Sequence, residues 1–273
     1  MPPLLYESHM HTPLCNHSSG MPGDYAAVAE KRNLKGIIVT CHAPMPNGYS
    51  ANVRMRPEEF GEYVALVDET SKEWAGRVDV RLGLESEYVP GYESWIEKLH
   101  QRAGFHHVLG SVHCQVSEYV AAYFKGDWLD FQRTYFRHLA EAAETGFYDT
   151  LSHPDLVKNE APDEWQLDRI MDDIRRSLDR IASAGTAMEL NTSGLNKTIP
   201  EMNPGQPILR EMCVRNIPVV IGADAHRPGR VADRYGDALR MLQEAGYGEV
   251  SFFLERKRQT VLIPVALASL ETA

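Results

Sequence analysis

Short apolar runs alternate with amphipathic stretches along most of the chain. Residues 36–40 form a continuous run of mainly β-branched side chains, which is typical of a strand buried on both faces. The stretches 127–145 and 163–184 are predicted to be helices, and each is followed by a glycine, Gly146 or Gly185, which commonly ends a helix. The pattern predicts repeated strand–helix units.

Seven such units follow one another without a linker rich in Gly, Ser or Pro, so we expect one parallel α/β domain over residues 1–273. The predicted strands are 3–6, 36–40, 78–85, 107–113, 150–153, 187–191, 219–223 and 250–254. The apolar tail after Lys257 is expected to pack against this body. Alternation alone fits either an open sheet or a barrel. Polar residues at the end of nearly every strand favour a barrel, whose active face is built from all its strand ends.

Composition narrows the class of protein. With 273 residues, 43% apolar and 24% charged, the chain is expected to be a soluble globular protein. A net charge of −10 argues against a nucleic-acid-coating surface. No apolar run is long enough to span a membrane, and the first residues lack the features of a signal peptide. The 4 cysteines form no CxxC pair, so we expect reduced thiols and a cytoplasmic location.

Metal-binding side chains follow nearly every predicted strand. His9 and His11 are two residues apart, so a strand turns both to the same face. The full candidate set is His9, His11, His17, His42, Glu85, His113, His153, Asp224 and His226. At about three protein ligands per ion, these nine suit about three divalent ions, provided that one carboxylate bridges. A mixed imidazole and carboxylate set without thiolate suits Zn, Fe or Mn.

Any one of these histidines taken alone could be a structural residue. The coincidence across six strand ends is what favours a metal centre. The other four histidines do not share the pattern and are expected to have packing or surface roles: His100, His106, His107 and His138.

Three neighbours of the candidate set are harder to assign. Cys41 and Cys114 are adjacent in sequence to candidate histidines, so alternation turns them to the opposite face, as buried small residues. The direction of Cys15 is not determined, because it lies in a loop. Glu87 shares a face with Glu85, and spacing does not choose between them.

Seven stretches of the chain, in this order, resemble the PHP (polymerase and histidinol phosphatase) family. They are Ser-His-Met-His-Thr-Pro-Leu-Cys-Asn-His at 8–17, Thr-Cys-His-Ala-Pro-Met at 40–45, Gly-Leu-Glu-Ser-Glu-Tyr at 83–88, Gly-Ser-Val-His at 110–113, Ser-His-Pro-Asp-Leu-Val-Lys at 152–158, Glu-Leu-Asn-Thr-Ser-Gly at 189–194 and Gly-Ala-Asp-Ala-His-Arg-Pro at 222–228. The first and the sixth resemble the monofunctional histidinol-phosphatase branch. The resemblance implies a distorted (β/α)7 TIM-like barrel with a trinuclear metal site at the C-terminal ends of its strands.

The resemblance also implies how the ligands are shared. His9, His11, Glu85 and Asp224 would hold one ion. Glu85 would bridge to a second ion held by His113 and His153. A third ion would be held by His17, His42 and His226. The chain departs from the family at Cys41, where an Asp is usual, and this change is expected to affect the orientation of His42 or a neighbour.

The implied reaction is hydrolysis of L-histidinol phosphate to L-histidinol and phosphate, in L-histidine biosynthesis, by attack of a metal-bridging hydroxide on phosphorus. Expected substrate or phosphate binders are Arg54, Arg56, Lys158, Asn191 and Arg227. Asp224 and His226, with Arg227 beside them, are the candidates for proton transfer and catalysis. Two alternatives stay open: a PHP phosphoesterase acting on another small phosphomonoester or nucleotide, and a non-catalytic metal-binding module. The expected partner is a small phosphomonoester, with no nucleic acid and no membrane.

Overall fold

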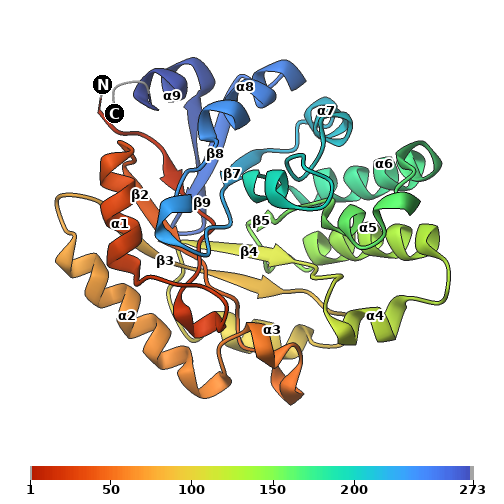
Figure 1. The fold of residues 1–273 in the computed structure, drawn as a ribbon, viewed down its shortest axis with the longest axis horizontal. Coiled ribbons are helices and arrows are strands. Elements are labelled where there is room, and N and C mark those ends of the chain that lie inside the picture. Colours follow the sequence, from red (N-terminus) through yellow and green to blue (C-terminus); the bar gives the residue numbers. More distant parts are fainter. Residues whose placement is uncertain (1, 271–273) are drawn as a thin grey trace.

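A parallel sheet lies at the centre of the molecule and helices surround it, as Figure 1 shows for the computed structural model, which describes residues 2–270. The strands are β1 (Tyr6–Glu7), β2 (Gly36–Val39), β3 (Asp79–Glu87), β4 (His107–Ser111), β5 (Thr150–Leu151), β6 (Ala187–Asn191), β7 (Val219–Gly222), β8 (Glu249–Leu254) and β9 (Lys257–Leu262). The helices are α1 (Pro22–Lys31), α2 (Phe60–Glu73), α3 (Glu93–His100), α4 (Ser117–Tyr123), α5 (Trp128–Glu144), α6 (Leu167–Ala184), α7 (Gln206–Val214), α8 (Tyr235–Ala245) and α9 (Ile263–Leu270).

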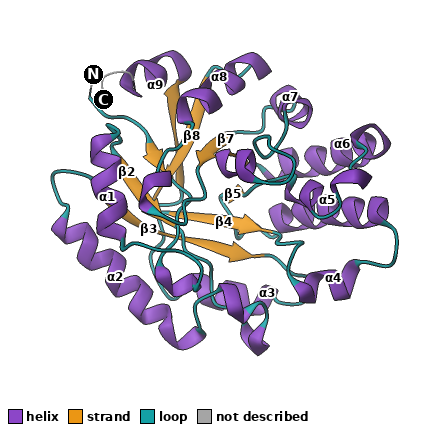
Figure 2. Cartoon of the chain, in the orientation of Figure 1, coloured by secondary structure: helices purple, strands orange, loops and turns teal. Residues whose placement is uncertain are grey.

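The strands pair in the order in which they occur along the chain. Strands β1 to β8 run parallel, and β9 pairs antiparallel with β8. Helices on the outside of the sheet connect the parallel strands, as Figure 2 shows by secondary structure. A buried apolar core lies between these helices and the outer face of the sheet. The predicted α/β fold is confirmed.

The barrel is distorted because its two sides meet at one end only. Beyond β1 and β7, Met10 and Ala225 form an isolated parallel bridge, with His11 N donating to Ala225 O at 3.0 Å and Ala225 N donating to His9 O at 2.9 Å. At the opposite end β8 extends the sheet past β7, and Phe252 stacks on Tyr6 of β1 with ring centroids 4.9 Å apart. The C-terminal ends of β1 and β7 are therefore drawn together, which brings the first and last candidate motifs side by side.

Several predicted boundaries were wrong. Strand β3 continues to Glu87, and α6 begins at Leu167 because residues 162–164 form a separate 3-10 turn. Helix α4 and strand β9 were not predicted. The turn between β8 and β9 uses Glu255 (φ 52°) and Arg256 (φ 62°) in place of the Asn-Gly or Asp-Gly pair that usually marks a tight hairpin, so the sequence carried no signal for it. Glycines 146 and 185 follow α5 and α6 in left-handed conformations, as expected.

Within residues 2–270, no helix is both long enough and apolar enough to cross a membrane.

Candidate metal centre

The candidate ligands come together where the strands end. His9 and His11 follow β1, His42 follows β2, Glu85 lies within β3, His113 follows β4, His153 follows β5, and Asp224 and His226 follow β7. His17 reaches the same region from the loop after the 3-10 turn Pro13–Cys15. Most of these side chains are buried, but His17 is exposed and His226 and Asp224 are partly exposed. The centre therefore has a buried floor and an open side.

Glu85 lies at the middle of the cluster and is 1% exposed. Its Oε2 atom lies 2.7 Å from His42 Nδ1, 3.4 Å from His9 Nε2 and 3.5 Å from His11 Nε2. Its Oε1 atom lies 3.1 Å from His153 Nε2 and 3.3 Å from His113 Nε2. The two oxygens thus face two different groups of histidines, which is the geometry of a bridging carboxylate.

Subsets of these residues lie close enough to hold an ion. In each of the following groups, one ligand atom per residue lies within 4.8 Å of the others: His9, His11 and Glu85; His42, Glu85 and His113; His9, His153 and Asp224; His17, His42 and His226; His11, Cys15 and His226. The fourth group has the composition that the family resemblance implied. The fifth adds a cysteine whose direction the sequence left open.

Unpartnered buried atoms provide a test of whether metal ions fit. His9 Nε2 and His226 Nε2 are shielded from solvent and have no hydrogen-bond partner among the described residues. His42 Nδ1 and Glu85 Oε2 are also shielded and, although 2.7 Å apart, do not form a hydrogen bond of suitable geometry. Leaving such atoms unpaired costs free energy, which a cation bound between them would remove. Burial lowers the pKa of His42 to about 3 and that of His11 well below its ordinary value, so both rings are neutral, as ligands must be. The residues therefore fit divalent ions.

Two further carboxylates contact candidate ligand histidines through the ring nitrogen that faces away from the cluster. Glu189 Oε1 lies 2.7 Å from His9 Nδ1, and its Oε2 accepts from His153 N and from Asn191 Nδ2, both at 2.9 Å. A Cβ at Gly222 would collide with Glu189 Oε1, so this approach requires glycine. Glu189 thereby orients one ligand ring and the backbone of another. Sequence reasoning missed it, although it lies two residues before Asn191 on the same face of β6.

Glu87 has the corresponding role on the other side. Its Oε2 lies 2.6 Å from His113 Nδ1, its Oε1 accepts from His113 N at 2.9 Å, and it also pairs with Arg54. Although burial opposes it, the carboxylates of Glu87 and Glu85 raise the pKa of His113 to about 9. Spacing in the sequence did not show whether Glu85 or Glu87 is the central carboxylate. In the structure Glu85 faces the middle of the cluster, and Glu87 contacts Nδ1 of His113, the nitrogen on the far side of that ring from Glu85.

Backbone carbonyls orient two more rings. His17 Nδ1 donates to Cys15 O at 2.7 Å, and His226 Nδ1 donates to Asp224 O at 3.1 Å. A carbonyl only accepts, so each ring carries its proton on Nδ1 and keeps the Nε2 lone pair for an ion. Asp224 (φ 48°) and His153 (φ 30°) are themselves in left-handed backbone conformations. Strain of this kind at non-glycine residues is common at functional sites.

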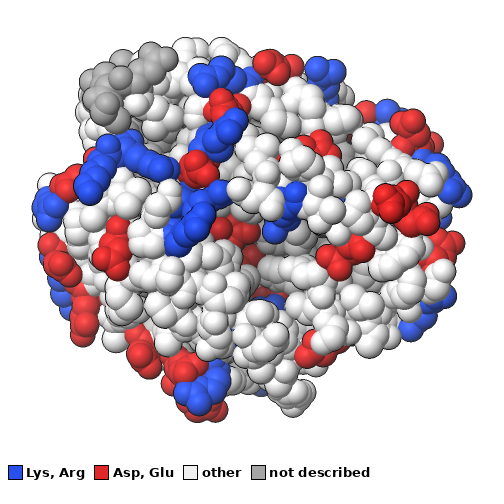
Figure 3. Space-filling view, in the orientation of Figure 1, with Lys and Arg blue, Asp and Glu red and all other residues white. Residues whose placement is uncertain are grey.

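A cavity of about 520 Å³ opens over the cluster, and Figure 3 shows the hollow with acidic atoms at its depth. Arg54 lines it, although its guanidinium is paired with Glu87. A neighbouring hollow shares His17, Asp224 and His226 and is also lined by Arg227. Lys197 lines both, and sequence reasoning missed it. Its place after the Asn-Thr-Ser-Gly stretch was the available signal.

Three of the predicted substrate binders have other roles in the structure. Lys158 is fully buried, with Nζ donating to Asp155 Oδ2 at 3.0 Å and Met202 O at 3.3 Å. Arg56 is 72% exposed and pairs with Glu59. Asn191 is fully buried against Glu189. None of the three is among the lining residues of the described cavities over the cluster, and their assignment as substrate binders stays a prediction.

Known proteins share both the sequence and the fold. The model of the PHP domain matches residues 7–193. The chain belongs to the PHP domain family. A probable histidinol-phosphatase of Deinococcus radiodurans is 38% identical over 93% of this chain and 98% of that protein. The histidinol-phosphatase of Bacillus subtilis is 26% identical over 84% of this chain and 96% of that protein.

Among solved structures, the chain resembles histidinol phosphate phosphatase from Lactococcus lactis, which was crystallised with zinc, L-histidinol and phosphate. The TM-score is 0.77 with 19% identity, and the match covers 93% of this chain and 98% of that one. At this identity the likeness concerns the fold, and it agrees with the distorted barrel described above.

Proposed function

We propose that this PHP protein is a histidinol-phosphatase that hydrolyses L-histidinol phosphate to L-histidinol and phosphate in L-histidine biosynthesis. The observation that carries the proposal is Glu85, whose two carboxylate oxygens lie among five histidine rings at the floor of an open cavity. The name of the Deinococcus radiodurans relative supports the substrate. In this proposal residues 1–273 act as one catalytic domain.

The proposed cofactor is a set of three divalent ions, Zn, Fe or Mn. The first ion would be held by His9, His11, Glu85 and Asp224, and the second by Glu85, His113 and His153. The third would be held by His17, His42 and His226. When bound, such ions lower the pKa of water and neutralise charge on phosphoryl oxygens. The chain's own contribution is to orient these rings through Glu87, Glu189 and two backbone carbonyls.

Cationic side chains at the open side are assigned to the phosphoryl group. Arg227 and Lys197 line the cavities beside Asp224 and His226, where their charges meet phosphoryl oxygens as these gain negative charge. Arg54 also lines the main cavity. Asp224 and His226 line both cavities together with Lys197, so we assign them the proton transfer to the departing alcohol.

Glu118 is proposed to recognise the ammonium group of the substrate. Of the described residues that line the main cavity, Asp224 and Glu118 are the carboxylates, and Glu118 lies on α4, outside the ligand cluster. Its Oε1 accepts from Ser50 N at 2.9 Å, and this hydrogen bond lowers the pKa of the carboxyl group. A fixed carboxylate on the wall suits a substrate that carries a positive charge a few bonds from its phosphate.

The test is phosphate release from L-histidinol phosphate, p-nitrophenyl phosphate and a nucleoside monophosphate. We expect kcat/KM to be highest for L-histidinol phosphate. Glu118→Gln should raise KM for that substrate about tenfold, the value of one charge-assisted hydrogen bond, and leave p-nitrophenyl phosphate unchanged. Glu97→Gln, at an exposed acid on α3, is the control. Equal kcat/KM for all three esters would refute the proposed substrate, and no hydrolysis of any would favour a non-catalytic metal-binding module.

A further inference from the structure

His11 has one ring nitrogen toward the cluster and one away from it. Nε2 lies 3.1 Å from Asp224 Oδ1 and 3.5 Å from Glu85 Oε2. Nδ1 is shielded from solvent and has no hydrogen-bond partner among the described residues. A neutral ring that binds an ion through Nε2 carries its proton on Nδ1, and a buried N–H requires an acceptor. His11 Nδ1–H therefore requires an acceptor in its buried surroundings.

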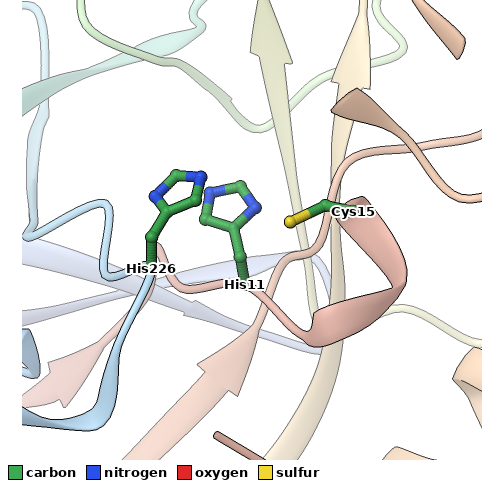
Figure 4. Close-up of side chains that lie close together, drawn as sticks. All are labelled: His11, Cys15 and His226. Carbon is green, nitrogen blue, oxygen red and sulfur yellow. The ribbon is translucent and has the colours of Figure 1, made fainter. Parts of the chain in front are cut away.

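Cys15 is placed to be that acceptor. Figure 4 shows its sulfur beside the His11 ring, on the side away from His226. Ligand atoms of Cys15 and His11 lie within 4.8 Å of each other, so a sulfur hydrogen bond requires the two side chains to move closer together. The sulfur is fully buried, so water does not compete for the N–H group. Cys15 ends the 3-10 turn, and its N–H donates to Thr12 O at 3.1 Å.

The same residue already orients a second ligand. Cys15 O accepts from His17 Nδ1 at 2.7 Å. Hydrogen bonding with Cys41, and with the His17 side chain, lowers the pKa of the Cys15 thiol against the effect of burial. Cys41 is itself fully buried and accepts from Thr12 Oγ1 at 3.2 Å. Cys15 therefore sits between two ligand histidines and is anchored from behind by a thiol and a threonine.

We propose that Cys15 is a positioning residue: its sulfur accepts from His11 Nδ1–H while its carbonyl accepts from His17 Nδ1–H, so that both rings keep Nε2 for metal. This rests on the ligand assignment of the proposed function, and not on the identity of the substrate. The competing role for Cys15 is that of a direct ligand to an ion held with His11 and His226.

The first test measures metal retention rather than hydrolysis. Purified protein is titrated with a chelator, and bound metal is counted by elemental analysis. We expect Cys15→Ala to lose one ion at a chelator concentration about 10- to 100-fold lower than wild type, the usual effect of removing a partner of a metal-bound histidine. Cys15→Ser, which restores a weaker acceptor, should lie between the two. Cys213→Ser, on α7, is the matched control and should match wild type.

A retention curve for Cys15→Ala that matches wild type would overturn the proposal. If Cys15→Ala does not fold, Cys15→Val replaces it, because valine fills the space without providing an acceptor. Wild-type metal retention in Cys15→Val would overturn the proposal. Wild-type retention in Cys15→Ser together with early loss in Cys15→Val would show that the serine hydroxyl acts as the acceptor, which supports it. The second test is the absorption spectrum of cobalt-substituted wild type. A sulfur-to-cobalt charge-transfer band would overturn the positioning role and make Cys15 a ligand, and its absence supports the proposal. Both results are independent of which phosphate ester the protein hydrolyses.

Discussion

Two sets of buried or partly buried histidines in this protein differ in what their ring nitrogens contact. In the metal centre, His9 and His113 face the carboxylates of Glu189 and Glu87 at 2.7 and 2.6 Å. Outside it, three histidines contact hydroxyl groups: His100 with Ser86 Oγ at 2.9 Å, His107 with Thr150 Oγ1 at 2.9 Å and His138 with Tyr119 OH at 2.8 Å. Burial alone therefore does not distinguish a ligand histidine from a structural one.

The difference has a physical basis. A carboxylate can stabilise a proton on Nδ1 while a cation occupies Nε2, which makes the ring a stronger ligand. A hydroxyl partner satisfies a neutral ring in a core and provides no counter-charge. Burial accordingly lowers the pKa of His107 to about 3 and those of His100 and His138 to about 4, whereas the pKa of His9 is held well above its ordinary value by Glu189, Asp224 and Glu85 against the effect of burial. For His9 and His113, the carboxylate partner distinguishes a candidate ligand from the structural histidines, whereas His11 and His42 have lowered pKa values like the structural set.

The largest effect is expected when the shared carboxylate is removed. Glu85→Gln replaces a bridging anion by an amide that turns N–H groups toward the histidines. We expect kcat/KM to fall about a thousandfold, because several kcal/mol of charge stabilisation is lost at about 1.4 kcal/mol per tenfold. Phosphate release and metal content are measured together, with Glu97→Gln as control. Full metal content in Glu85→Gln would contradict the assignment of Glu85 as a bridging ligand. Full metal content in His9→Ala would likewise contradict the assignment of His9 as a ligand.

A smaller effect is expected from the carboxylates behind the ligands. Glu189→Gln keeps the shape and the hydrogen bond to Asn191 but removes the charge next to His9 Nδ1. Metal affinity should fall about 10- to 100-fold. Competition with a fluorescent chelator measures it, and Cys213→Ser again serves as control. Unchanged affinity would mean that the carboxylate partner is not what distinguishes the two sets of histidines.

The smallest effect concerns the structural set and pH. The pKa of His107 is lowered from 6.5 to about 3 in the folded protein, so its contribution to stability is complete above pH 6.5 and is lost progressively as pH falls toward 3. His107→Gln removes this proton uptake. Between pH 6 and pH 5 the free energy of unfolding should therefore fall by about 1 kcal/mol less in the variant than in the wild type.

Urea unfolding of metal-free protein at the two pH values gives this difference without interference from bound ions. His106→Gln is the comparison variant, and because His106 is less buried, a smaller change is expected there. An unchanged pH dependence in His107→Gln would show that this ring is not held neutral by the core.

The helix and strand pattern was predictable where periodicity is long or apolar, as in β2, α5 and α6. It failed for α4, which has seven residues, and for β9, whose outward side chains are mostly polar and exposed. The clustering of the strand-end histidines was predictable, because all of them follow the same ends of parallel strands. The cations were predictable only in part: Arg54 and Arg227 line the cavities, whereas Lys197 was missed and Lys158 and Arg56 do not line them. Position in a loop does not show where a side chain points.

The sequence by itself determined that nine side chains of the types that bind metals follow or lie near the ends of successive strands, and that the chain resembles the PHP family, to which the domain match assigns it. Strand periodicity and chain order are local properties, so they can be read without coordinates. Only the tertiary structure decided which carboxylate is central, which residues hold the ligand rings from behind and where Cys15 points. Those contacts join residues far apart in the chain, such as His9 and Glu189. They exist because the barrel brings the ends of β1, β6 and β7 together.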